Sequence, residues 1–487
     1  MATIRGTSNT SEIASYVAQL IDLERRSGAA KVYSDEKESL TLRSATLTDL
    51  RTNLNTLNSK AQTLAKPGTL SPFGAKTVAT SAPAVVTATA SAGTVSGVHT
   101  VLVTQLARRS TLVSTQWLQG GNELASVTGE GSHTFRISIN GVDTQVTVAV
   151  GAADDNRTVL SAIAAAVNAS DAKVTASVVN DTSTTARLML IGDESGSGAA
   201  VTLADVSGTL VASTGTSSAV QSNGTAGGYV YATDQLDARF VLDGLAITRG
   251  RNVVEDVVPG LTITLTSPQA ADAQPVTLTV GPDQESIKAK VQEFIEAYNA
   301  TIAFLKERTS VSVSTETRAT GTTDVRSVNR GTLASESAYL GLMMKLRADV
   351  AGRITTGATG GPVALSEMGI TAGKDGALSI SDNAKFVKAL TEKPDAVTAL
   401  FNSDDGVATR VSARLKQFLA AGGTVDNALA STTARLQSVN RAIERQEAYL
   451  RVKQATLLEQ YTSLQETLVQ LQEQQLTLDS IAALYYV

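Results

Sequence analysis

Cysteine is absent from this 487-residue chain, and histidine, tryptophan and proline are scarce. Without cysteine there are no disulfide bonds and no thiol chemistry. The two histidines, His99 and His133, both fall in β-rich sequence, and a zinc site built on them would need additional carboxylates. The net charge of −5 comes from 41 basic and 46 acidic residues without a basic patch, which argues against nucleic acid as a partner.

Targeting and membrane-spanning segments are also missing. The start MATIRGTSNTSEIASYVAQL has neither the basic first residues nor the apolar block of a signal peptide. No stretch is long and apolar enough to cross a bilayer. The sequence therefore predicts a protein that is cytoplasmic, or one exported by a route without a cleaved signal peptide.

Motifs that carry catalysis are missing as well. The glycine-rich GDESGSGAA lacks the Lys-Ser/Thr of a phosphate loop and the G-x-S-x-G order of a nucleophile elbow, so we interpret it as a turn. Acidic clusters at 153–155 and 403–405 lack the spaced ligands of a calcium loop and are interpreted as caps and turns. We expect no catalytic residue, no metal site, no cofactor and no enzymatic activity.

A strict heptad repeat is present near the C-terminus. Its one-register aliphatic residues are Leu436, Ile443, Leu450, Leu457, Leu464, Leu471 and Leu478. The last glycine is Gly423 and the last proline is Pro394, so no helix breaker interrupts the run. This pattern predicts a left-handed coiled-coil seam, and its narrow apolar stripe suits a partner helix. One long helix packed on its own domain is the alternative.

A second coiled-coil pattern lies near the N-terminus, after apolar Ile13, Val17 and Leu20. It has two apolar heptad rows. One contains Leu40, Leu47, Leu54 and Ala61, and the other contains Leu50, Leu57 and Leu64. The helix is predicted to stop at the breaker cluster KPGTLSPFG. The simplest partner for the C-terminal helix is this N-terminal one, running antiparallel to it.

The middle of the chain, about 70 to 282, is rich in Thr, Val, Ala, Gly and Ser, a composition that predicts β structure. TFRISINGVDTQVTVAV predicts a hairpin around Asn140-Gly141, a pair that favours a type I′ turn. A capped helix with Val159, Leu160 and Ile163 at helical spacing follows, and then two strands, which together give a β-β-α-β-β unit.

Helix returns after this β-rich zone with DQESIKAKVQEFIEAYNATIAFL, followed by a polar loop predicted at about 309 to 330. The predicted fold is α+β: long N- and C-terminal helices form an antiparallel coiled-coil leg, with a β-rich two-domain head inserted between them. The predicted parts are 1–40 and 440–487 as terminal helices, 41–75 and 283–439 as helical leg, 76–125 and 230–282 as one head domain, and 126–229 as the second.

Several stretches resemble the flagellar filament cap protein family, also called hook-associated protein 2 or FliD. SPFGAKTVATSAPAVVTATASAGTVSGVHTVLVTQLARRSTLVS is similar to the family's N-terminal region. FVLDGLAITRGRNVVEDVVPGLTITL, VQEFIEAYN and LSEMGITAGKDGALSISDNAKFVKAL are similar to its C-terminal region. The β-β-α-β-β unit resembles the short hook IN motif of flagellar hook and cap proteins.

This resemblance implies a non-enzymatic, extracellular protein at the tip of the bacterial flagellar filament, where a cap promotes folding and insertion of flagellin. It further implies a homo-oligomer, commonly a pentamer, and export without a cleaved signal through the flagellar type III apparatus with an export chaperone. Hook-associated junction proteins are implied neighbours, and in some members the heads bind host surface glycans in adhesion.

Two other functions compete with the cap at this point. Another axial protein, of the hook–filament junction type or flagellin itself, would also pair its terminal helices. A secreted adhesin would use the β-rich head, but it would need exposed aromatic residues to stack on sugars, and Trp117 is the only tryptophan. The stretches FIEAYN and SISDNAKFVKAL favour the cap.

Overall fold

The computed structural model describes residues 10–216, 219–270, 272–316, 325–355 and 360–485. The chain divides into two compact units. One combines the two ends of the chain, Met1–Pro67 and Lys288–Val487, and the other is the inserted segment Gly68–Ile287. The α+β fold predicted from the sequence is confirmed, with helices from both chain ends in one unit and the β-rich segment between them.

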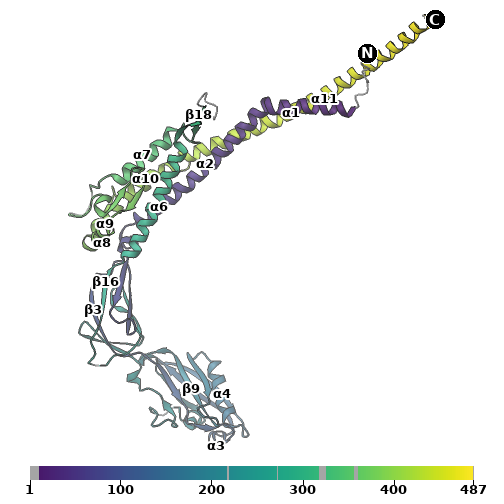
Figure 1. The fold of residues 1–487 in the computed structure, drawn as a ribbon. Helices are drawn as coiled ribbons and strands as arrows, with labels where there is room; N and C mark the ends of the chain where they lie inside the picture. The colour runs from purple at the N-terminus through teal and green to yellow at the C-terminus, as the bar shows by residue number, and fades with distance from the viewer. Residues whose placement is uncertain (1–9, 217–218, 271, 317–324, 356–359, 486–487) are drawn as a thin grey trace. The chain divides into compact units, whose positions relative to one another are not determined.

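Three long helices dominate the first unit: α1 (Thr10–Ser27), α2 (Ala29–Leu64) and α11 (Thr424–Tyr485). With 62 residues, α11 extends for about 93 Å at 1.5 Å per residue. Helices α1 and α2 both pack along α11, in the antiparallel direction predicted for the leg (Figure 1).

Gly28 separates α1 from α2, a break that the heptad pattern did not predict. Its backbone is extended (φ −95°, ψ −160°), so it cannot continue the helix. A Cβ atom at this position would lie 2.6 Å from the backbone oxygen of Glu24, so the close approach of the chain here requires glycine.

The remaining elements of this unit are mostly helical, and among them α10 packs on both α2 and α11. They are α6 (Gln284–Thr309), β17 (Val311–Glu316), β18 (Val325–Arg330), α7 (Ser337–Ala351), η5 (Leu365–Met368), β19 (Ile370–Ala372), β20 (Leu378–Ile380), α8 (Asn383–Glu392), α9 (Pro394–Asn402) and α10 (Val407–Leu419). The loop predicted at about 309–330 was wrong at 311–316 and 325–330, where β17 and β18 pair antiparallel from Val311↔Arg330 to Glu316↔Val325. Residues 317–324 of the predicted loop lie outside the described residues. In β17, Val311 and Val313 alternate with serines, a pattern that suits a strand, and the polarity of the segment hid this alternation.

The inserted unit contains two separate hydrophobic cores, which define two lobes. The first lobe has a five-stranded sheet ordered β1-β16-β3-β12-β13 and a three-stranded sheet ordered β14-β15-β2. Its strands are β1 (Lys76–Thr80), β2 (Val86–Ala90), β3 (Gly97–Gln105), β12 (Ala238–Leu242), β13 (Leu245–Arg249), β14 (Val253–Val258), β15 (Leu261–Leu265) and β16 (Val276–Pro282).

The second lobe holds the predicted β-β-α-β-β unit. Its elements are β4 (Arg109–Val113), β5 (Trp117–Leu118), α3 (Glu123–Thr128), β6 (Gly131–Ile139), β7 (Val142–Val150), α4 (Asn156–Asn168), β8 (Val174–Val179), β9 (Thr185–Ser195), η3 (Ser197–Ala199), β10 (Val201–Ser207), α5 (Leu210–Thr214) and β11 (Gly228–Tyr229). The two halves of the unit join different sheets. Strands β6 and β7 form a three-stranded sheet in the order β10-β6-β7, whereas β8 and β9 belong with β4, β5 and β11.

Local features of this lobe agree with the sequence. Ile139 pairs with Val142, so a two-residue turn joins β6 and β7. Asn140 and Gly141 have positive φ angles of 49° and 76°, as a type I′ turn requires. The Asp155 side chain accepts a hydrogen bond from the Thr158 amide and caps α4, whose buried face packs on β7 and β8.

Candidate assembly surface on the terminal helices

The predicted seam on α2 lies at the centre of the helical unit. Leu47, Leu50, Leu54 and Leu57 are fully buried and Leu64 is almost so, whereas Leu40 is only partly covered. These leucines face α10 and α11 rather than a single partner helix. Both predicted rows on α2 therefore contain buried leucines.

The predicted row on α11 changes character along the helix. Leu436, Ile443 and Leu457 are partly covered and Leu450 is fully buried, packed with Val17 and Ile21 of α1. Beyond that point Leu464, Leu471 and Leu478 are 55–66% exposed. The row thus has an inner part that packs inside this chain and an outer part that faces solvent.

Ion pairs fix the register of the antiparallel helices. Arg25 of α1 donates two hydrogen bonds to the Glu447 carboxylate at 2.9 and 3.0 Å, and the Lys453 ammonium reaches Glu24 at 2.7 Å. The hydrogen bonds to Glu447 raise the pKa of Arg25, and those from Arg25 lower the pKa of Glu447. Such exposed pairs add little stability individually, but they disfavour a slipped register.

The outer part of α11 carries an apolar stripe, here called the terminal stripe, which Gln474 and Gln475 interrupt between Leu471 and Leu478. Its members follow helical spacing and are 42–66% exposed: Tyr461, Leu464, Leu468, Leu471, Leu478 and Ile481. Helix α1 begins at Thr10, and α11 continues past it (Figure 1). A stripe of this kind is typical of a surface that another protein covers.

Apolar side chains of α1 extend this surface. Tyr16, Leu20 and Leu23 are 67%, 46% and 63% exposed, and with Ile13 and Tyr461 they line a shallow cavity of about 380 Å³. In the sequence, Leu20 stood out only as a helix-forming residue, and Tyr16 and Leu23 did not stand out. The i, i+4, i+7 spacing of Tyr16, Leu20 and Leu23 places them on one face of a helix and could have been recognised in the sequence. The sequence does not show that this face lies beside Tyr461 of α11.

Three glutamates alternate with the outer leucines and lie on the opposite face. Glu459, Glu466 and Glu473 are all exposed, which is the position expected for an outward-facing stripe two residues past each leucine. The leucines of the row and these glutamates therefore occupy different faces of α11, and two further exposed apolar residues, Val469 and Leu476, lie within one turn of the glutamates.

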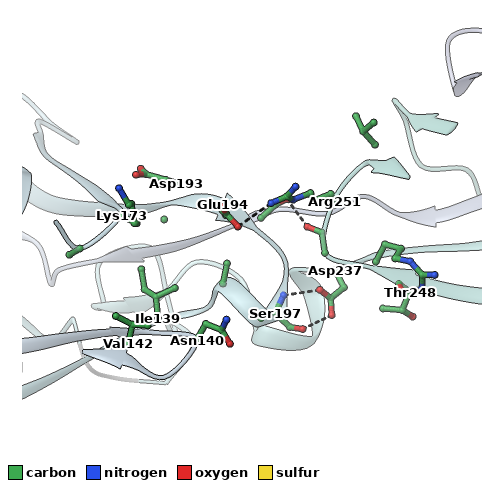
Figure 2. A pocket seen from close by; sticks show the side chains of 18 of the residues that line it. Ile139, Asn140, Val142, Lys173, Asp193, Glu194, Ser197, Asp237, Thr248 and Arg251 are labelled. Atoms are coloured by element: carbon green, nitrogen blue, oxygen red, sulfur yellow. Dashed lines mark hydrogen bonds and ion pairs between the residues drawn. The ribbon is translucent and has the colours of Figure 1, made fainter. Parts of the chain in front are cut away.

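A second hollow lies in the inserted unit, between the two lobes. It has a volume of about 900 Å³, and its charged lining residues are largely engaged with protein groups (Figure 2). Arg249 pairs with Asp256 at 3.0 Å, and its hydrogen bonds lower the pKa of that carboxyl. The Ser195 hydroxyl donates to the Gly250 backbone oxygen and the Ser197 hydroxyl to Asp237, so both serines are held by structural bonds.

We searched the described residues for groups of metal ligands and for helices that could span a membrane. Among these residues, no group of three or more histidine, aspartate or glutamate side chains is arranged to hold a metal ion. None of the helices, over the same residues, is long and apolar enough to cross a membrane. The histidines are placed structurally: His99 hydrogen-bonds Asp243 at 2.7 Å, and buried His133 bonds the Gly129 backbone oxygen.

Comparison with known proteins gives a consistent result along the chain. A family model described as the N-terminus of flagellar hook-associated protein 2 matches residues 10–110, and one described as its C-terminus matches residues 236–473. The A-type flagellar hook-associated protein 2 of Pseudomonas aeruginosa is 27% identical over 97% of this chain and 95% of its own length. The B-type protein of P. aeruginosa PAO1 is 30% identical over 54% of this chain and 53% of its own.

A solved structure shares the fold. The crystal structure of the D1-D2-D3 domains of the flagellar cap protein FliD from Escherichia coli aligns with a TM-score of 0.57 and 22% sequence identity. The alignment covers 80% of this chain and 99% of that one, so it includes both the helical and the β-rich parts.

Proposed function

The chain belongs to the flagellar hook-associated protein 2 family, the cap proteins of the bacterial flagellar filament, and on that premise we propose that it promotes the folding and insertion of flagellin at the distal tip. As a member of this structural family it is not an enzyme, and it acts outside the cell at the filament tip. The match to hook-associated protein 2 sets aside the junction-protein and flagellin alternatives.

The observation that supports an assembly role most directly is the terminal stripe. We propose that it is covered by neighbouring copies of this chain, so that the outer leucines Leu464, Leu471 and Leu478 form the oligomer seam and the inner ones hold the leg together. Burying what remains exposed of each stripe residue would contribute about 1 kcal/mol. Association costs roughly 4–15 kcal/mol, so one stripe alone binds weakly.

In a closed ring each subunit has two neighbours, and both can cover its terminal stripe. The apolar area buried per subunit is then larger than in a single pair, which offsets more of the cost of association. The pentamer expected from the family resemblance is such a ring. The helical unit would form its legs and the two lobes its head, and we keep the predicted division into terminal helices, leg and two head domains as part of this proposal.

Flagellin, the junction proteins, an export chaperone and the type III export apparatus are the partners this proposal requires. The absence of cysteine suits export of an unfolded chain, since no disulfide has to be broken or formed. Binding of host glycans by the heads stays a prediction from the family resemblance.

Deletion of the gene tests the proposal. We expect cells with hooks but few or no filaments, and flagellin released into the medium, both reversed by the wild-type gene. Filaments of normal length in a clean deletion strain would exclude the capping role. Electron microscopy of filament tips with labelled protein would show its place directly.

A further inference from the structure

The two lobes of the inserted unit have separate cores, and little besides one polar joint connects them. Within the described residues, the strands of one lobe do not pack extensively on those of the other, and the 900 Å³ hollow lies between them. Lobes joined in this way move relative to each other unless something fixes them. The contacts at the joint therefore decide whether the lobes move.

The joint is formed by the turn between β9 and β10 of the second lobe, which reaches two segments of the first. The Asp237 carboxylate, just before β12, accepts the Ser197 amide at 2.7 Å and the Ser197 hydroxyl at 2.6 Å. The Ser195 hydroxyl donates to the Gly250 backbone oxygen at 2.6 Å. Figure 2 shows Asp237 and Ser197 directed toward one another at the edge of the hollow.

Backbone contacts tighten the same joint. The Gly196 amide donates to the backbone oxygen of Arg108, in the segment that connects the lobes, at 3.0 Å. Asn252 holds the neighbouring Ala107 by two hydrogen bonds, accepting from its amide at 2.7 Å and donating to its oxygen at 3.0 Å. The connecting segment is therefore bonded to both lobes, which restricts rotation about it.

Gly196 allows this close approach. Its φ of 99° and ψ of 160° lie in a region that essentially only glycine adopts. A Cβ atom there would lie 2.5 Å from the Cα of Gly250, closer than any real contact. The relation is not symmetric, because a Cβ on Gly250 would meet Gly196 at 3.5 Å, an ordinary van der Waals distance.

From these contacts we infer that Gly196, Ser197 and Asp237 form a latch that fixes the angle between the two lobes, so that the head moves as one rigid body. Asp237 positions the turn that carries Gly196, because its two carboxylate oxygens accept hydrogen bonds from the amide and the hydroxyl of Ser197. The Arg251–Glu194 pair at 3.3 Å borders the latch, but both side chains are largely exposed and contribute little. This inference does not depend on the proposed function.

The test measures the distance between the lobes in the full chain. Because the protein has no cysteine, Thr87→Cys in β2 and Gln145→Cys in β7, both at exposed positions, provide the only sites for two spin labels. Dilution with unlabelled protein removes distances between copies. Double electron–electron resonance should give a single narrow distance distribution for the otherwise wild-type chain.

Matched variants distinguish loss of the latch contacts from an unspecific effect of substitution on the fold. Gly196→Ala and Asp237→Ala should lose the single narrow distribution. Gly250→Ala should keep it, as should Gly198→Ala, where an added Cβ meets nothing within 4 Å. Asp237→Asn should also keep it, because an amide can still accept from the Ser197 amide and bond its hydroxyl.

Two results would overturn the inference: a broad distribution in the wild-type background, or an Asp237→Ala distribution as narrow as that of Asp237→Asn. A thermal melt of each variant checks that both lobes stay folded. If Gly196→Ala unfolds the second lobe, the comparison of the two Asp237 variants decides alone.

Discussion

At the scale of single residues, Leu450 and Leu464 occupy the same heptad row of α11 in different environments. Leu450 is fully buried with Val17 and Ile21, whereas Leu464 is 55% exposed on the terminal stripe. Two chemically identical truncations can therefore separate folding of the leg from its assembly.

Leu450→Ala should destabilise the packing of α1 on α11 by about 2–5 kcal/mol, the usual cost of a large-to-small change in a core. Leu464→Ala should leave the unfolding of the monomer nearly unchanged but weaken self-association. Urea denaturation followed by circular dichroism measures the first effect and sedimentation velocity the second. Equal effects of both variants on unfolding would contradict the division of the row into inner and outer parts.

Acidic residues that link helices make the leg sensitive to low pH. The Glu447 carboxylate accepts hydrogen bonds from Arg25, which lower its pKa. The Glu293 carboxylate of α6 accepts a hydrogen bond from Lys290 of the same helix and one from Lys60 of α2, both at 2.8 Å, and these lower the pKa of Glu293. A carboxyl with a lowered folded-state pKa stabilises the fold above its unfolded pKa, about 4.3. That contribution is lost as the pH falls through the folded value.

We therefore expect the free energy of unfolding of the helical unit to fall below pH about 4.3. Glu447→Gln should start less stable at neutral pH and lose less on acidification, because it has no proton to take up there. Denaturation curves at several pH values measure this. A wild-type loss on acidification no larger than that of the variant would show that the Arg25–Glu447 pair does not contribute.

At the scale of elements, α11 matters as one uninterrupted helix. Its inner part binds α1 and α2 in this chain, and its outer part presents the terminal stripe, so a break between them separates the two roles. Leu457 lies at this transition and is partly covered.

Leu457→Pro should remove a backbone donor and clash with the preceding turn, at a cost of about 3 kcal/mol or more. The β-rich unit has its own cores, so its melting transition should persist while helical signal is lost. The variant should fail to restore swimming to a deletion strain. Leu457→Met, which keeps volume and apolarity, is the control. Normal swimming with the proline would argue against a working seam.

At the scale of the whole molecule, the chain ends share one unit and the inserted segment forms the other. The inserted unit is built from sheets closed within Gly68–Ile287 and two buried cores. It has the size at which an independent core is stable.

The segment 68–287 should therefore fold when expressed alone. We expect native β signal in circular dichroism and a cooperative thermal transition that matches one transition of the full chain. The reciprocal deletion variant, in which a short linker replaces this segment, should keep the helical signal of the leg. A non-cooperative melt of the isolated segment would mean that the lobes depend on the helices.

Patterns of short range were determined by the sequence itself. The heptads of α2 and α11, the type I′ turn at Asn140-Gly141 and the Asp155 cap depend on backbone geometry and on neighbours a few residues away. A segment with heptad apolar periodicity and no glycine or proline favours one long helix. Two such segments at the two ends of the chain favour pairing with each other along their apolar seams.

Tertiary structure decided the rest, because it depends on which distant surfaces meet. Identical heptad leucines became core at Leu450, which packs on Val17 and Ile21 of α1, and surface at Leu464, which is 55% exposed. The sheets took strands from distant segments, so the β-β-α-β-β unit was shared between two of them. The sequence of the glycine-rich GDESGSGAA predicts a plain turn, and its bonds to Asp237 and Gly250 exist only where the two lobes come together.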